Sequence, residues 1–442
     1  MKPLLIHGGH IIDPGQGIDE AAGLLIEDGK ISRLGKGEIT PPPTDYDMLD
    51  ASGLIVCPGF VDLHCHLRQP GFEERETIAT GTRAAARGGF TTICCMPNTE
   101  PPLDNQATID YVKSTAASEG IVRVLPIGCI SRGRKGEELT GMAELASAGA
   151  IAFSDDGKPA LNSDLMRRAM DYSRTSGLPI IDHCEDTALS KGGQVNEGAI
   201  SARLGLKGIP NAAEEIIVAR DLALAQLTGG WLHVAHTTTE GSVDLIRRAR
   251  EKGIRVTAEV TPHHLTLTEE ALTGYNTNAK VNPPLRTRQD IEALIQGLKE
   301  KVIDIIATDH APHTEADKQR EFALAPFGIS GFETALGSLM SLVHDKKLTL
   351  ATLISRLTCE PARIIGNKYG KLGTLATGAP ADVTIFDPAR EWVVDSRAFA
   401  SKGKNTPLEG SVLKGRVMAT IFQGKLVYGD GSVKLEAKRG AI

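Results

Sequence analysis

The chain has 442 residues, of which 41% are hydrophobic and 24% charged, and its net charge is −6. This composition supplies a full hydrophobic core, excludes extensive disorder and argues against a dedicated nucleic-acid-binding protein. Seven cysteines without paired spacing exclude a disulfide scaffold, and no apolar run approaches the ~18 residues of a membrane span. Because the first residues are also too interrupted for a signal peptide, we expect a cytoplasmic protein without a membrane partner.

The two ends of the chain predict short β-strands joined by turns. The segments LLIHGGHII and GLLIEDGKISRLG carry Gly8-Gly9 and Asp28-Gly29, dipeptides that are typical of hairpins. Residues 371–442 show the same pattern of short apolar runs separated by turn residues, with the runs DVTIFDP and VMATIFQGKLVYG. Neither end is long enough to bury a core alone, so we expect residues 1–57 and 371–442 to form one small β-sandwich domain.

Residues 58–370 predict a catalytic domain of a different kind, in which short apolar runs alternate with helical patterns. The eight runs are IVCPGFVDLHCH, FTTICCMPN, VRVLPIGCI, AIAFSDDG, LPIIDHCED, WLHVAHTTT, IRVTAEVTPHH and VIDIIATDHAPH. Eight strand-then-helix units predict an α/β fold, a parallel (β/α)₈ TIM-like barrel, with a doubly wound open sheet as the alternative. Residues 190–211 and 312–331 exceed ordinary loops and are typical of lids or substrate-binding loops.

Residues of the types that bind metals stand where the runs end. The candidates are His64 and His66 after run one, Asp155 and Asp156 after run four, His183 after run five, His236 after run six and Asp309 after run eight. In a barrel these ends converge on one face. Histidine nitrogens and carboxylate oxygens suit zinc and related divalent ions. His64 and His66 are two apart on a strand, so both side chains can point to one ion.

Each candidate also has a structural alternative. A lone histidine at a strand end is more often a hydrogen-bond partner, Asp155-Asp156-Gly157 is a common turn sequence, and Asp309 could cap a helix. Counting one of the two aspartates after run four, six such residues stand at the ends of five of the eight runs, which is more than these separate alternatives explain. The arrangement therefore predicts a metal site.

The remaining histidines lack this placement or are ambiguous. The histidines predicted to be structural are His7, His10, His233 and His344. His263 and His264 end run seven, but adjacent residues of a strand face opposite ways, so at most one of them can point to the site. By the same argument Cys65 faces away from the site between its two histidine neighbours.

The stretch HCHLR after GFVD resembles the metal motif of the amidohydrolase superfamily. The longer resemblance is to dihydroorotases of the bacterial type I class, relatives of hydantoinases and allantoinases. It is carried by PGFVDLHCHLRQPG, MPNTEP, FSDDG, DHCED, HVAHTTT, VTPHHL, VNPPLR, ATDHAPH, PFGISGFET and the tail SKGKNTPLEGSVLKG, and it covers essentially the whole chain. The resemblance implies zinc-dependent, reversible hydrolysis of (S)-dihydroorotate to N-carbamoyl-L-aspartate, a step of de novo pyrimidine (UMP) biosynthesis.

The resemblance also implies a metal centre with one or two Zn²⁺ ions per subunit. In it, His64, His66 and Asp309 are the ligands of one ion, His183 and His236 those of a second, and Asp156 is the bridge, with Asp155 as the alternative. In hydantoinases and some dihydroorotases a carboxylated lysine bridges instead, but Lys158 lies beyond Gly157 in the loop. A bound metal ion lowers the pKa of its water to about 7 and so supplies hydroxide as the nucleophile, with Asp309 as general base and then acid.

The substrate-binding residues follow from the same resemblance. They are Arg68, Asn98, Asn282, His313, Phe327 and Gly328. Arg68 and Asn98 are expected on the substrate carboxylate, because a guanidinium can make two parallel hydrogen bonds to that planar group. The backbone at Phe327 and Gly328 is expected to hydrogen-bond the ring.

Two rival functions remain open at this point. One is a hydantoinase- or allantoinase-like cyclic amidase, against which Arg68, Asn98 and the absence of a lysine at the end of run four argue. The other is a non-catalytic dihydroorotase-like partner of aspartate transcarbamoylase, against which the six intact candidate ligands argue. Besides the small-molecule substrate, the resemblance leaves a homodimer and an active association with aspartate transcarbamoylase as expected partners.

Overall fold

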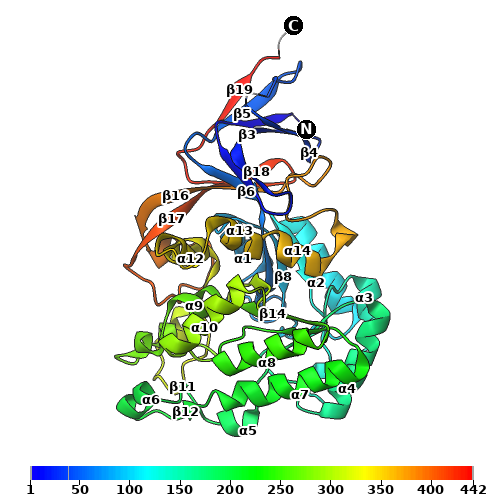
Figure 1. Cartoon of the computed structure of the whole chain (residues 1–442), viewed down its shortest axis with the longest axis vertical. Helices are drawn as coiled ribbons and strands as arrows, with labels where there is room; N and C mark the ends of the chain where they lie inside the picture. The colour runs from blue at the N-terminus through cyan, green and yellow to red at the C-terminus, as the bar shows by residue number, and fades with distance from the viewer. Residues whose placement is uncertain (1, 38, 441–442) are drawn as a thin grey trace.

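The computed structural model describes residues 2–37 and 39–440 and has an α/β part and a β part (Figure 1). The strands of the β part pair in the order β18-β17-β16-β6-β2-β3-β1-β5-β19, with β4 on β3. Their bounds are Leu4–His7 (β1), His10–Asp13 (β2), Ile18–Glu27 (β3), Lys30–Lys36 (β4), Tyr46–Asp50 (β5), Ile55–Pro58 (β6), Val383–Val393 (β16), Val412–Phe422 (β17), Lys425–Gly429 (β18) and Leu435–Lys438 (β19). Strands from both chain ends therefore share one sheet.

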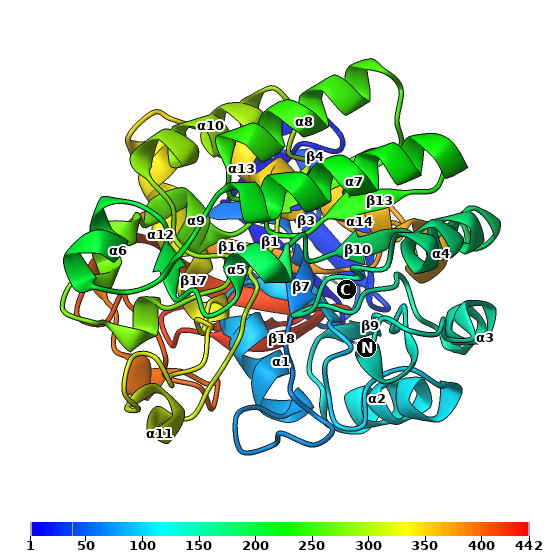
Figure 2. The same ribbon diagram turned by 90° about the horizontal axis from the view of Figure 1, so that it is seen from below.

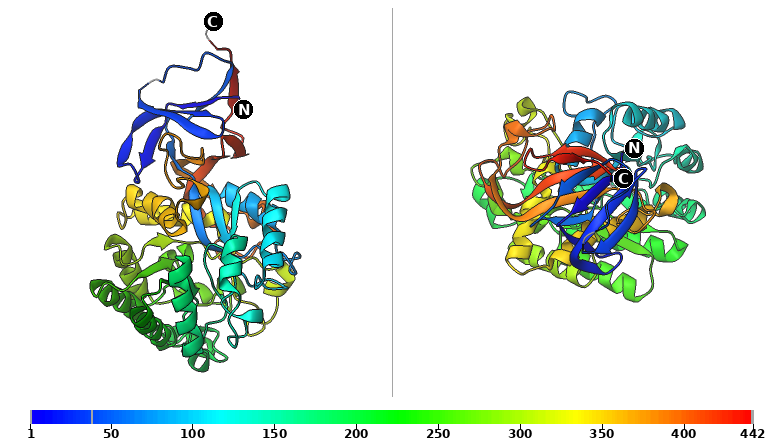
Figure 3. Two further views of the ribbon diagram at one scale, coloured as in Figure 1. Left: turned by 90° about the vertical axis from the view of Figure 1, so that its right-hand side faces the viewer. Right: turned by 90° about the horizontal axis from the view of Figure 1, so that it is seen from above.

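A common hydrophobic core explains why the two ends stay together. Strand β6 pairs antiparallel with β16, and β5 with β19, so hydrogen bonds join the ends twice. Buried side chains of both ends pack in one cluster, which includes Ile6, Leu24, Leu49, Ile385 and Ile421. Figures 1 and 3 show both termini on this part, away from most of the helices.

One of the two predicted hairpins is confirmed and one is wrong. The Asp28-Gly29 turn joins β3 to β4, with φ of 48° and 73° at the two residues, as a tight two-residue turn requires. At Gly8-Gly9, in contrast, β1 and β2 do not pair with each other. Both strands pair antiparallel with the ten-residue β3, because that strand is long enough to cover them one after the other.

The α/β part is built on parallel strands that correspond to the predicted runs. They are β7 (Phe60–Cys65), β8 (Phe90–Cys95), β9 (Arg123–Pro126), β10 (Ile180–Asp182), β13 (Leu232–Val234), β14 (Val256–Val260) and β15 (Ile305–Ile306). Pairing runs from β7 through β8 to β9, and from β10 through β13 and β14 to β15. Run four forms only isolated parallel bridges, from Phe153 to Gly128 and Ile180, and run eight reaches β7 by a bridge between His310 and Cys65.

Helices surround these strands (Figure 2). Their bounds are Ile78–Arg87 (α1), Gln106–Glu119 (α2), Met142–Ala148 (α3), Ser163–Ser176 (α4), Thr187–Ser190 (α5), Ala199–Leu204 (α6), Ala212–Thr228 (α7), Glu240–Glu251 (α8), Pro262–Thr266 (α9), Arg288–Lys299 (α10), Glu315–Lys318 (α11), Ala335–His344 (α12), Leu350–Leu357 (α13) and Cys359–Ile365 (α14). Threonine N-caps such as Thr239 and Thr287 accept hydrogen bonds from backbone NH groups of the first turn. The caps fix where α8 and α10 begin after β13 and β14.

The two long loops contain secondary structure that local patterns did not reveal. Residues 190–211 contain α6 and the paired strands β11 (Val195–Asn196) and β12 (Gly208–Ile209). Residues 312–331 contain the single-turn helix α11, capped by Thr314. Among the residues that the structure describes, no helix combines the length and apolarity that crossing a membrane requires.

Candidate active site

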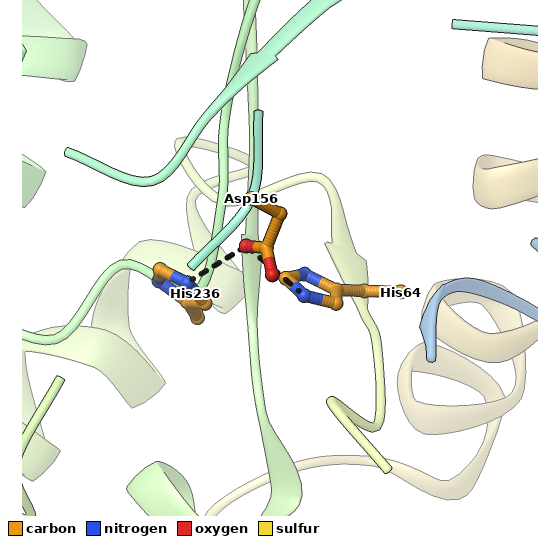
Figure 4. A group of neighbouring side chains, drawn as sticks. All are labelled: His64, Asp156 and His236. Carbon is orange, nitrogen blue, oxygen red and sulfur yellow. Dashed lines mark ion pairs between the residues drawn. The ribbon is translucent and has the colours of Figure 1, made fainter. Parts of the chain in front are cut away.

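Six predicted metal ligands meet at the carboxyl ends of the parallel strands. Asp156 lies at their centre, with its Oδ1 3.4 Å from His64 Nε2, 3.7 Å from His183 Nδ1 and 3.7 Å from His236 Nε2. Its Oδ2 is 3.6 Å from His66 Nε2. Figure 4 shows the Asp156 carboxylate between His64 and His236.

Asp309 completes the group on the side of the first two histidines. Its Oδ1 lies 3.0 Å from His66 Nε2 and 3.6 Å from His64 Nε2. Two ligand atoms that each lie ~2.0–2.1 Å from one tetrahedral zinc ion are about 3.3 Å apart, so the observed spacings suit shared coordination. His64 Nε2 and Asp156 Oδ1 are moreover buried without a hydrogen-bond partner. Buried polar atoms that lack partners are rare, so the cluster fits a divalent cation.

The charges of the cluster also suit a cation. Burial disfavours the charged form of His64, but the carboxylates of Glu259, Asp156 and Asp309 outweigh this and raise its pKa well above the usual value. Burial likewise opposes the ionised form of Asp156, yet the histidines around it hold its pKa well below the usual range. A bound cation would replace protons on these histidines and receive the same stabilisation.

The alternative bridge, Asp155, points elsewhere. Its Oδ1 accepts hydrogen bonds from the backbone NH groups of Ile130 (3.0 Å) and Ser131 (3.1 Å), and its Oδ2 accepts one from the Ser131 hydroxyl. Lys158 is exposed in the following loop. Asp156 is thus the residue of run four that lies among the histidines.

Glu259 is a residue of the site that the sequence analysis missed. It lies inside β14 with no exposed surface, and its Oε1 is 2.5 Å from His64 Nδ1. The same oxygen accepts a hydrogen bond from the backbone NH of His236 (3.2 Å), and Oε2 is 3.1 Å from His233 Nε2. The sequence did contain a signal for it, which is the acidic residue within the apolar run VTAEV. A carboxylate buried in a strand needs a polar partner, so Glu259 could have been expected to hold another side chain. Glu259 orients His64 so that Nε2 faces the cluster.

Substituting Glu259 should therefore weaken metal binding without touching a ligand. We expect Glu259→Gln to lower metal affinity by ~10–100-fold, the usual effect of removing a partner of a metal-binding histidine. Titration of the chelated protein with zinc under a competing chelator measures this. Glu251→Gln, at the end of α8, is the control. Unchanged affinity in Glu259→Gln would show that His64 keeps its orientation without the carboxylate.

The other histidines lie outside the cluster. His7 and His10 belong to the β part and His344 ends α12, while His233 is hydrogen-bonded to Thr257 and Glu259. The prediction that His263 and His264 face opposite sides of a strand is wrong. Strand β14 ends at Val260, and both histidines lie on α9. His264 contacts the Pro283 carbonyl at 3.0 Å. Cys65 turns away, as predicted, with its Sγ toward the Cys94 carbonyl.

Three site residues have left-handed backbone conformations. The φ angles are 63° at Arg68, 28° at His236 and 44° at Asp309. For residues other than glycine this region costs about 1–3 kcal/mol, and such strain concentrates at functional sites. Each of these residues lies two or three positions beyond the end of a parallel strand, β7, β13 or β15.

A cavity of about 200 Å³ opens onto the cluster. Its lining contains all the predicted site residues except the fully buried His64, together with Gly157 and Ala311: His66, Arg68, Asn98, Asp156, His183, His236, Asn282, Asp309, His313, Phe327 and Gly328. We call residues 312–331, which supply the last three, the active-site loop. The tertiary structure thus brings the predicted metal and substrate residues into one space.

The cationic side of this cavity is formed by Arg68. Burial lowers the pKa of its guanidinium to about 10, which leaves it charged at neutral pH. Its Nε donates to the Pro312 carbonyl (3.3 Å), and its Nη2 lies 3.4 Å from His313 Nε2. Burial and the charge of Arg68 hold the pKa of His313 well below its usual value, so this ring is neutral and donates from Nε2 to the Phe327 carbonyl (2.8 Å).

The two predicted asparagines each contact a histidine of the cluster or a carboxylate beside one. Asn98 Oδ1 lies 2.9 Å from His66 Nδ1, so this amide orients His66. Asn282 Nδ2 donates to Glu185 Oε2 (3.0 Å), and that carboxylate oxygen lies 3.0 Å from His183 Nε2. Because Glu185 holds His183 Nε2, the other ring nitrogen faces Asp156. Glu185 is a second residue that the analysis of strand ends missed.

Comparison with solved structures identifies the class. Over 99% of its length the chain superposes on an L-hydantoinase (dihydropyrimidinase) from Arthrobacter aurescens, with a TM-score of 0.87, 26% identity and 98% of that chain covered. A dihydropyrimidinase from Brevibacillus agri NCHU1002 has the same fold, with a TM-score of 0.84, 23% identity and coverage of 99% of this chain and 97% of that one. Fold and site together define an amidohydrolase-type cyclic amidase.

Sequence comparison narrows the class to one family. Residues 53–242 match the family model described as dihydro-orotase-like. A dihydroorotase from Thermoanaerobacter sp. (strain X514) is 53% identical over 426 residues, which cover 96% of this chain and 97% of that protein. One from Pelotomaculum thermopropionicum is 53% identical over 432 residues, with coverages of 98% and 100%. The chain belongs to the dihydroorotase family, which confirms the resemblance and makes it an enzyme of the cyclic-amide hydrolases.

Proposed function

We propose that the protein is a zinc-dependent dihydroorotase that interconverts (S)-dihydroorotate and N-carbamoyl-L-aspartate. The observation that carries this proposal is one cavity that is lined both by the histidine–aspartate cluster and by the half-buried guanidinium of Arg68. The cluster suits the scissile amide, and the guanidinium suits the carboxylate that distinguishes dihydroorotate from hydantoin. Named relatives at 53% identity over nearly the full length support this substrate.

The ligand atoms fall into two groups. His64, His66 and Asp309 would hold one ion, and His183 and His236 would hold a second. Asp156 would be shared by both, because its carboxylate lies 3.4 Å from His64 and 3.7 Å from His236 through Oδ1, and 3.6 Å from His66 through Oδ2. Zinc is the proposed metal, since nitrogen and carboxylate ligands at these spacings suit it. When bound, such an ion activates water and polarises the amide carbonyl.

Asp309 is the proposed general base and acid. Burial would raise the pKa of its carboxyl group, but the interactions with His64, His66 and His236 outweigh burial and hold that pKa well below the usual range. In hydrolysis it takes the proton of the attacking water and gives it to the ring nitrogen as the carbon–nitrogen bond breaks. The opened product then carries a carbamoyl NH2 group, formed from the ring nitrogen, and a new carboxylate, formed from the former amide carbonyl. In the reverse direction the same group removes the proton from that nitrogen.

Arg68, Asn98 and Asn282 are the proposed binding groups for the substrate. The guanidinium and the Asn98 amide bind the ring carboxylate, and Asn282 with the Phe327–Gly328 backbone and His313 binds the ring. His313 serves as a neutral group here, since its pKa is lowered. A neutral ring beside the Arg68 guanidinium leaves that charge available for the substrate.

Removing the guanidinium should mainly weaken substrate binding. We expect Arg68→Ala to raise the KM for dihydroorotate by an amount that corresponds to roughly 1.5–3 kcal/mol, the range for charged hydrogen bonds. Steady-state kinetics measure this, with Arg132→Ala, which lies in an exposed turn, as the control. Unchanged kinetics of Arg68→Ala would show that Arg68 does not bind the substrate carboxylate.

A single comparison tests the function as a whole. The zinc content of the purified protein is measured, and turnover of dihydroorotate and of hydantoin is assayed side by side. We expect bound zinc and a preference for dihydroorotate. A preference for hydantoin would assign the site to the hydantoinase-like alternative, and bound zinc without turnover of either compound would favour the non-catalytic partner of aspartate transcarbamoylase.

The finer architecture is part of the proposal. We infer that the parallel strands close into a (β/α)₈ barrel, supported by the His310–Cys65 bridge and by the Thr308 NH and hydroxyl, which donate to Asp62 at 2.7 and 2.8 Å. The barrel is assigned to residues 58–370, and residues 1–57 and 371–442 to a β-sandwich around the shared core, although residues 1, 38, 441 and 442 lie outside the described residues. Seven buried free thiols support a reducing compartment such as the cytoplasm. A homodimer and an association with aspartate transcarbamoylase stay predictions.

A further inference from the structure

Asn405 belongs to the KNTP stretch of the tail, to which the proposed reaction assigns no role. It lies in the segment between β16 and β17, which we call the strap, residues 394–411. The side chain is only 3% exposed although it belongs to an irregular segment. A buried amide has two donor hydrogens and an oxygen that can accept twice, so its partners show what it stabilises.

The Asn405 amide bonds to both ends of the active-site loop. At the first end, its Oδ1 accepts from the His313 backbone NH (3.0 Å) and its Nδ2 donates to the Ala311 carbonyl (3.1 Å). At the second end, its Nδ2 donates to the Gly328 carbonyl (3.0 Å) and its Oδ1 accepts from the Ser330 hydroxyl (2.8 Å). The Asn405 carbonyl also accepts from the Ser330 NH at 2.8 Å. The hydrogen-bonding groups of the side chain are thus all used on the loop and on Ala311, which directly precedes it.

The strap is itself anchored next to the site. The backbone NH groups of Ala400 and Ser401 donate to the Glu333 carboxylate at 2.9 and 3.2 Å, and the Ser401 hydroxyl donates to Glu76. At Gly403 a Cβ atom would come within 2.5 Å of the Pro312 side chain, so the strap lies directly against the loop. Figure 2 shows this orange segment beside α11.

We propose that Asn405 is a positioning residue for substrate binding, which holds the two ends of the active-site loop together so that His313, Phe327 and Gly328 face Arg68. The inference rests on the proposed function for its substrate, and it adds a residue from the tail to the active site. His313 is held through its backbone and Gly328 through its carbonyl, so loss of the amide acts on both substrate-binding positions at once. The metal ligands are held by the strands and by Glu259 and should not respond.

The test uses the full-length, zinc-loaded protein with Asn405→Ala or Asn405→Asp. The aspartate keeps the shape and the accepting oxygen but loses the two donors to Ala311 and Gly328. We expect KM for dihydroorotate to rise about tenfold or more, since up to four buried loop groups lose a partner. We expect kcat to change by less than about threefold and the zinc content to stay the same. Without substrate, loop amides should exchange hydrogen faster, while those of β7 and β8 stay protected.

Asn162→Ala is the matched control. It removes the same atoms from another asparagine, whose Oδ1 caps α4 by accepting from the NH groups of Asp164 and Leu165. KM and loop exchange should stay at wild-type values in it.

Three results would overturn the positioning role of Asn405. They are a KM within about twofold of wild type in both variants, unchanged loop exchange, and failure of both variants to fold with bound zinc, which would make Asn405 a determinant of the fold. If the wild-type protein does not turn over dihydroorotate, the proposed function fails. The exchange experiment needs no substrate and still decides whether Asn405 holds the loop.

Discussion

Asp309→Ala should abolish turnover of dihydroorotate while the protein stays folded. The carboxylate is expected to act twice, as a metal ligand 3.0 Å from His66 Nε2 and as the group that moves the proton. Loss of general acid–base catalysis alone costs ~10²–10⁴-fold in rate, and loss of a ligand adds to it. Steady-state turnover in both directions measures the effect.

Asp309→Asn separates the two roles. The amide keeps the shape and one potential ligand oxygen but cannot accept a proton from water. We expect zinc content close to wild type and a loss of kcat of the same order as in the alanine variant. Asp110→Ala, on the surface of α2, serves as the control for loss of a carboxylate. Wild-type-like rates in either Asp309 variant would refute the mechanism.

Removal of the metal should also abolish turnover, and readdition of zinc should restore it. The reason is that six side chains predicted to bind metal lie together, with His64 Nε2 and Asp156 Oδ1 buried and without hydrogen-bond partners. A ligand that binds only the folded state stabilises it by about 2.7 kcal/mol at a concentration one hundred times its Kd. The melting temperature of the chelated protein should therefore rise with added zinc.

Asp156→Asn supplies the matched comparison for metal removal. Its carboxylate faces the histidines of both proposed ions, so the variant should bind less zinc and show a smaller rise in melting temperature. Asp155→Asn should keep its zinc, because that carboxylate is turned toward Ile130 and Ser131. Full activity in the wild-type protein after exhaustive chelation would contradict a metal-dependent reaction.

Part of the site could be predicted because strand topology does the positioning. The carboxyl ends of parallel strands meet on one face, so His183, His236 and Asp309 could be grouped from their places in the runs alone. Glu259 could not be found in this way, because it lies inside a strand and matters through the ring nitrogen of His64 that it holds. The prediction for the histidines of run seven was wrong for a local reason. Thr261 caps α9, so His263 and His264 lie on a helix and not on a strand.

The β part also contains one feature that adjacent residues determine and one that a distant strand determines. The Asp28-Gly29 turn is determined by two adjacent residues whose positive φ angles suit it, and it formed as predicted. Gly8-Gly9 carries an equally good turn signal, but the pairing of β1 and β2 is decided by the distant and longer β3. A turn can thus be predicted from its own residues only where the two strands beside it pair with each other.

By itself, the sequence determined the family, the strand-then-helix order of the central part and the residue types of the metal cluster. Those features depend on short stretches and on a repeating order of elements. The tertiary structure alone decided which carboxylate of Asp155 and Asp156 lies among the histidines, that Glu259 holds His64, and that Asn405 hydrogen-bonds both ends of the active-site loop. These are contacts between residues up to 195 positions apart, as between His64 and Glu259, and they depend on packing geometry that no local pattern encodes.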